Sequence, residues 1–248
     1  MTQTKDSSVY ISRRDPALKV GFAIFMAVAI AALGWVMMTV SSSPTVKGAS
    51  FLWLPAALQL VAGIWLGPVY GTLAGGIGAY AAGNLAYGGW GLVDIIQNPI
   101  AGGLANALLP WVLFRALRIA PTMGASRPAD VLSGAVRALI LTALVLLSGM
   151  LAPLLGIPGA WGYLIPLVVL LVGARLLLSN LSLNMRDFGL GLLVAFIICV
   201  VSAFIGAIGA ALTDPGVGWF AGDLVSAILG LYLLPLYTTR LRNAGIAE

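Results

Sequence analysis

Histidine is absent from this sequence, and cysteine occurs only once, as Cys199. The missing histidine removes the commonest general base and the commonest metal ligand. A single cysteine excludes an internal disulfide, and its apolar surroundings suit a small packing residue. Walker-type nucleotide loops, Cys/His clusters and serine nucleophile elbows are absent as well. We therefore predict a protein that is not an enzyme and that uses neither a metal nor a cofactor.

Charge is also scarce: 8% of the 248 residues are charged, whereas 60% are hydrophobic. A soluble domain usually carries about a quarter charged residues. The apolar residues form stretches that are each about as long as the roughly 20 residues needed to cross a bilayer as a helix. We therefore predict an all-α, polytopic integral membrane protein with about eight transmembrane helices, near residues 18–40, 51–67, 69–86, 93–114, 131–155, 161–180, 188–212 and 219–239.

The positive charges predict the orientation of these helices, because cytoplasmic loops are enriched in lysine and arginine. Both termini then face the cytoplasm: residues 1–17 and 240–248 are tails, and residues 18–239 form one multi-pass domain in a bacterial or archaeal inner membrane. The net charge of +5 is explained by this placement, so nucleic acid is not an expected partner. The basic residues assigned to the cytoplasmic side are Lys5, Arg13, Arg14, Lys19, Arg115, Arg118, Arg127, Arg137, Arg186, Arg240 and Arg242, against Lys47 outside.

Small residues mark two features of the predicted bundle. The Gly67–Gly71 turn joins the second and third segments and predicts a tight hairpin. The sequence leaves open whether the 69–86 segment crosses fully or re-enters. Ala23, Ala27 and Ala31 recur every four positions, and such rows let helices approach closely in lipid. Packing within the bundle explains this row, and the alternative is a docking surface for another membrane subunit.

Two carboxylates require an explanation, because the orientation puts Asp94 and Asp223 at or just below the external surface. Gln97 and Asn98 follow Asp94 and share its face on a helix. Pro99 fits a first helical turn with Asn98 as its N-cap. The helix could therefore begin below the surface, as discontinuous helices at substrate sites do. An ordinary capped helix end at the headgroups is the alternative.

Other polar and aromatic residues lie at a similar level. Asn84 closes the third segment, and Asn106 lies two turns below Asn98. Tryptophan is more frequent on the external half, which either an aromatic belt or a ligand pocket explains. The residues predicted to line such a pocket are Trp53, Asn84, Asp94, Gln97, Asn98, Asn106, Trp219 and Asp223.

Two stretches resemble a known family. Residues 50–68, with Leu-Trp-Leu-Pro at 52–55 and a Gly/Ala-rich segment ending at Asn84, are similar to a helix pair of MASE-type membrane-associated sensor domains. Residues 219–223, Trp-Phe-Ala-Gly-Asp with Gly230 and Pro235 downstream, are similar to that family's final helix. The resemblance implies eight helices and a signal passed to a cytoplasmic kinase or cyclic-dinucleotide domain. No such domain follows the last predicted helix, so we expect a partner protein to supply it.

The 67–71 turn, the Gly/Ala-rich third segment and the alanine row also resemble the substrate-binding S-component of energy-coupling-factor transporters. In those six-helix proteins a small-residue row on the first helix docks the transmembrane coupling subunit. Our leading prediction is a non-enzymatic membrane module that binds a small ligand from the external side and signals to a partner protein. The alternative is an S-component-like substrate-binding subunit of a multi-subunit importer of vitamins or other small molecules.

Overall fold

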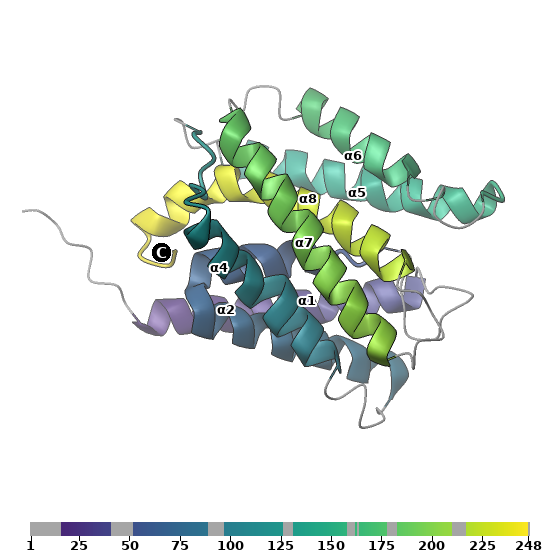
Figure 1. Cartoon of the computed structure of the whole chain (residues 1–248), viewed down its shortest axis with the longest axis horizontal. Coiled ribbons are helices and arrows are strands. Elements are labelled where there is room, and N and C mark those ends of the chain that lie inside the picture. The colour runs from purple at the N-terminus through teal and green to yellow at the C-terminus, as the bar shows by residue number, and fades with distance from the viewer. Residues whose placement is uncertain are drawn as a thin grey trace, which may run out of the picture.

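The computed structural model describes residues 16–40, 52–88, 97–125, 131–157, 162, 164–177, 183–209 and 217–247. Every regular element in these residues is helical, which confirms the all-α prediction. The helices are α1 (Pro16–Val40), α2 (Pro55–Tyr87), η1 (Ile100–Leu108), α4 (Leu109–Ala116), α5 (Val131–Leu154), α6 (Leu164–Leu177), α7 (Met185–Gly209) and α8 (Val217–Asn243), as Figure 1 shows.

Each predicted apolar segment contains helix in its described part. By length and composition, four helical stretches of the described residues could cross a membrane: Pro16–Thr39, Pro55–Ala86, Met185–Gly206 and Phe220–Asn243. Their outward faces carry large apolar side chains such as Phe25, Val28 and Phe204, each more than 60% exposed. Such faces suit contact with lipid, because the hydrocarbon core of a bilayer is itself apolar. The protein is therefore an all-helical chain with several candidate membrane spans.

The α2 helix is folded back on itself at Gly67 into two arms, residues 55–66 and 68–87. Gly67 has φ 79° and ψ −173°, a conformation open essentially to glycine alone. A Cβ atom on Gly71 would lie 2.6 Å from the carbonyl oxygen of Ala62, nine residues earlier. In a straight helix those residues would be separated by about 13 Å. The predicted hairpin is therefore present, and the Pro55–Ala86 stretch is not one straight rod.

Replacing Gly67 by alanine is expected to destabilise the protein by about 1–3 kcal/mol, because a Cβ atom opposes the backbone conformation of the reversal. Thermal unfolding of the purified protein in detergent measures the change. Gly189→Ala in α7 is the control, because nothing lies within 4 Å of a Cβ atom there. Equal melting temperatures for the two variants would contradict this account of the hairpin.

The folded-back α2 is the centre of the bundle and contacts α1, η1, α4 and α8. Its second arm packs against α1, where a Cβ atom on Gly78 would lie 2.8 Å from the carbonyl oxygen of Ala27. Ala23 and Ala31 are buried within the chain, and Ala27 is half-buried between them. The alanine row therefore packs inside the molecule, since small side chains let the two helices approach closely.

Two hydrophobic clusters pack the other helices against α8. The larger contains Leu60, Trp65 and Leu231, and the Trp65 indole N–H donates to Thr238 Oγ1 over 2.8 Å. The smaller contains Leu141 of α5 and Leu170 of α6, and these two helices contact each other and α8. In Figure 1, α8 accordingly lies between the α5–α6 pair and the α1–α2 pair.

Three arginines, Arg115, Arg118 and Arg242, lie together at the end of the bundle where the chain ends; Figure 1 marks that end with C. Lys19 lies over the Tyr70 ring at 5.6 Å, which brings the start of α1 to the α2 reversal. The backbone N–H of Ala120 donates to Asp187 Oδ2, which joins the end of α4 to the start of α7. The end of α8 belongs to the same body, because Ile246 and Ala247 are buried in the larger cluster. In its described part, the predicted 240–248 tail is therefore packed against the helices.

Candidate functional site

Four buried polar side chains meet between the first arm of α2, η1, α7 and α8. They are Gln59, Asn106, Ser202 and Asp223, each at most 2% exposed. Burying polar groups in an apolar bundle costs free energy unless they pair with one another. Each comes from a different element, so only the tertiary packing brings them together. We refer to these four side chains as the Asp223 network.

The Asp223 network is a chain of hydrogen bonds with Asn106 at its centre. The Asn106 amide N–H donates to Gln59 Oε1 over 3.0 Å, and its side chain is also a hydrogen-bond partner of Asp223. The Ser202 hydroxyl donates to Asp223 Oδ2 over 2.7 Å. The orientation of the Asn106 amide is consistent with these partners, because its NH2 group faces two oxygen acceptors.

Two polar atoms of this network have no partner among the described residues. They are Nε2 of Gln59, a donor, and Oδ1 of Asn106, an acceptor. A buried donor or acceptor left unpaired costs about 1–3 kcal/mol. Such atoms in a folded protein call for an explanation, and a bound molecule that supplies the missing partners is one. The network therefore offers an unused donor, an unused acceptor and a carboxyl group within one small region.

The backbone beside the network is unusual. Residues 100–108 form a π-helix, whereas most π-helices are single-turn bulges that often occur at functional sites. Glycine lets this helix lie against both arms of α2: a Cβ atom on Gly102 would lie 2.8 Å from Gln59 Nε2 and 2.7 Å from the Ala79 Cβ. The network is therefore closely enclosed where η1 packs against α2.

A further polar contact lies along the same η1–α7 interface. Gln97, which is 9% exposed, donates through Nε2 to the carbonyl oxygen of Gly206 over 3.2 Å. Gly206 lies one helical turn beyond Ser202 on the same face of α7. This single contact therefore lies on the side of the Asp223 network that is opposite the basic residues.

The structure brings together only part of the predicted pocket. Asn106 and Asp223 meet in the network, and Gln97 lies along the interface that leads to it. Asn98 is half-buried in a helical stretch that already includes Gln97, so Asn98 lies inside the helix and not at the predicted N-cap position. Asp94 lies outside the described residues. Trp219 belongs to α8, but its side chain also lies outside them.

Two predicted residues lie apart from the network. The Asn84 amide donates to the carbonyl oxygen of Tyr80 on its own helix over 3.2 Å. Trp53 packs across α1, where its ring would lie 2.9 Å from a Cβ atom on Gly34. Both therefore have local contacts, and their place in a shared pocket stays a prediction.

Gln59 and Ser202 were missed by the sequence analysis. Gln59 was detectable, because it is an isolated polar side chain within the apolar stretch 55–66, and such residues in a membrane segment are functional candidates by default. Ser202 carries no comparable signal, since serine is common in membrane helices and bonds its own backbone readily. Only the pairing with Asp223 distinguishes it.

Comparison with known proteins assigns no family to the chain: no family model, no curated protein and no solved structure matches it.

Proposed function

We propose that the chain crosses a bacterial or archaeal inner membrane eight times, with both termini in the cytoplasm. The clustering of Lys19, Arg115, Arg118, Arg186 and Arg242 at one end of the bundle supports this orientation, because positive residues are retained on the cytoplasmic side. In this orientation the Asp223 network lies nearer the external surface, since Asp223 is six residues from the start of α8 at Val217.

We further propose that the protein is a non-enzymatic module that binds a small polar ligand at the Asp223 network. The pair of unpartnered amide atoms beside the Asp223 carboxyl group carries this proposal. Gln59 Nε2 requires an acceptor, and Asn106 Oδ1 requires a donor. A small solute with a carbonyl oxygen and an ammonium or amide N–H group would supply both and would place its donor near Asp223.

Ligand binding would be reported by repacking of η1 between α2, α7 and α8. The π-helical hydrogen bonds of η1 make it the element best suited to change its register. A partner protein that contacts the cytoplasmic end would read the change, in keeping with the sensor family that the sequence resembles. We place this role ahead of substrate delivery to a transporter, because the alanine row suggested as a docking surface faces α2.

A thermal-shift screen of the full chain in lipid nanodiscs tests ligand binding. The probes are small amines, amides and amino acids, each added in excess. A ligand at 100 times its Kd stabilises the folded state by about 2.7 kcal/mol. We expect at least one of these probes to raise the melting temperature of the wild type and to lose this effect in Asp223→Asn, which preserves the side-chain shape.

Asp187→Asn is the matched control, because Asp187 is also a buried carboxylate but lies at the basic end, where it accepts from Ala120. This variant should respond to the same probe as the wild type does. The proposal fails if no probe stabilises the wild type, or if Asp223→Asn and Asp187→Asn respond alike.

A further inference from the structure

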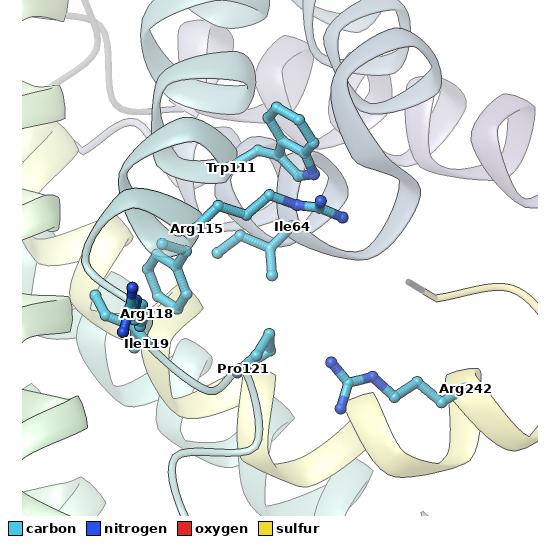
Figure 2. Close-up of a pocket in the computed structure, with 8 residues that line it drawn as sticks. Ile64, Trp111, Arg115, Arg118, Ile119, Pro121 and Arg242 are labelled. Carbon is cyan, nitrogen blue, oxygen red and sulfur yellow. The ribbon is translucent and has the colours of Figure 1, made fainter.

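A second site lies at the basic end of the bundle, away from the Asp223 network. It is a cavity of about 180 Å³ between the ends of α4 and α8, shown in Figure 2. Arg115 and Arg118 come from the end of α4, and Arg242 comes from the last turn of α8. Buried Ile64 and Phe114 provide apolar walls.

Arg118 lies in the turn after α4, at a position where the backbone geometry favours glycine. The Ile119 N–H donates to the Phe114 carbonyl over 2.8 Å, and the Arg118 N–H donates to Arg115 over 3.2 Å. These bonds define a Schellman motif, in which the residue at the Arg118 position adopts a left-handed conformation and is usually glycine. Arg118 has φ 54°, a value that residues other than glycine adopt rarely.

The end of α8 provides a direct comparison within the same chain. There Ile246 donates to Leu241 and Gly245 donates to Arg242, so the same motif forms with Gly245 at the left-handed position and φ 75°. The turn geometry therefore does not require arginine at the equivalent place in α4. Non-glycine residues held in this conformation cluster at functional sites. A role for the Arg118 side chain in the cavity explains why arginine occupies the turn.

The three guanidinium groups suit a phosphate group. Arginine presents a planar fork of donors that matches phosphate oxygens, and several forks round one cavity complement its spread charge. The Arg115 guanidinium stacks over the Trp111 ring at 4.6 Å, which orients the fork at the cavity rim. The apolar walls of the cavity would contact the uncharged part of a molecule whose phosphate group the arginines bind.

We propose that this cavity binds the phosphate group of an anionic phospholipid, with Arg115, Arg118 and Arg242 as its ligands. The position favours a lipid, because the cavity lies at the end of α8, a candidate membrane span, and the topology proposed above, on which this inference rests, puts that end at the cytoplasmic headgroups. Basic pockets between helices on the cytoplasmic side bind anionic headgroups in other membrane proteins. A soluble phosphate compound shares the same chemistry, and the test separates the two sources.

The experiment uses the full chain in neutral detergent. Native mass spectrometry measures retention of phosphatidylglycerol, with phosphatidylcholine as the zwitterionic comparison. We expect selective retention of phosphatidylglycerol by the wild type. Removal of one charged donor should lower this retention at least about tenfold in Arg118→Gly and in Arg115→Ala. Arg118→Gly should keep or raise the melting temperature, since glycine suits the turn, and Arg118→Asn is a second variant that tolerates the left-handed conformation.

Arg186→Ala is the matched control, because it removes one arginine from the same end but does not line the cavity, and its side chain is 70% exposed. This variant should retain phosphatidylglycerol as the wild type does. In a parallel assay, inorganic phosphate is added at constant ionic strength: stabilisation of the wild type and not of Arg118→Gly, without lipid selectivity, would support a phosphate site filled from solution. Equal retention by the wild type, Arg118→Gly and Arg115→Ala, with no response to phosphate, would overturn the proposal. A loss in Arg186→Ala as large as in Arg118→Gly would also overturn it.

Discussion

Replacing Gly63 by alanine is expected to destabilise the folded bundle by about 3 kcal/mol, the largest effect that we predict for a single methyl group. Gly63 lies in the first arm of α2, where its missing side chain allows the backbone of η1 to pass directly over it. A Cβ atom there would overlap the carbonyl oxygen of Ala107, and it would lie 2.6 Å from the carbonyl carbon and 2.9 Å from the Cα atom.

These neighbours are backbone atoms, so no side-chain rotation can relieve the overlap. η1 would have to shift as a whole, and its shift would disturb the contact between Gly75 and the Gly102 carbonyl, where a Cβ atom would lie 2.6 Å away. Thermal unfolding in detergent measures the loss. Gly21→Ala in α1 is the control, because no atom lies within 4 Å of a Cβ atom at that position and alanine favours a helix. A Gly63→Ala protein as stable as Gly21→Ala would contradict the close approach of α2 and η1.

Replacing either Gln59 or Asn106 by leucine is expected to cost about 2–3 kcal/mol, whereas replacing both should cost less than the sum. Asn106→Leu removes the donor to Gln59 Oε1 and the partner of Asp223. Gln59→Leu removes one of the two acceptors of the Asn106 amide, the Gln59 Oε1 atom at 3.0 Å. In the double variant neither member of this pair is left with an unpaired group, although Asp223 still lacks Asn106.

Equilibrium unfolding of the four proteins completes the double-mutant cycle, and we expect a coupling of about 1–2 kcal/mol. Asn84→Leu is the matched control, because it makes the same chemical change at a residue whose described bond is to Tyr80 of its own helix. That variant should change stability by less than about 0.5 kcal/mol. Additive losses for Gln59→Leu and Asn106→Leu would show that the two amides act independently and would remove the basis for the network.

The helical architecture was predictable because long apolar stretches in a chain with few charges have few alternatives in lipid. Backbone groups must pair within their own segment, so each such stretch forms a helix. The reversal at Gly67 was also predictable, since Gly-Pro at 67–68 interrupts an apolar stretch that would otherwise continue. Local chemistry decides both features, and local chemistry is readable from neighbouring residues.

The candidate site was only partly predictable. Asp223 and Asn106 were identified because polar side chains in apolar segments are rare enough to be noticed individually. Their partners Gln59 and Ser202 lie on other helices, far away in sequence, and nothing in the spacing links residue 59 with 106 or 202 with 223. The pairing depends on how the helices rotate about their axes, which is set by the close approaches of glycines such as Gly63, Gly75 and Gly102.

The amino-acid sequence by itself determined an all-helical chain with several candidate membrane spans and a reversal at Gly67, because these follow from hydrophobicity and backbone freedom over short stretches. The tertiary structure alone decided which way each helix faces. It turned Ala23 and Ala31 toward α2, joined Gln59 to Asn106, and brought Arg118 and Arg242 to one cavity. The physical reason is that helix rotation is set by packing summed over many distant contacts, none of which is encoded within a single segment.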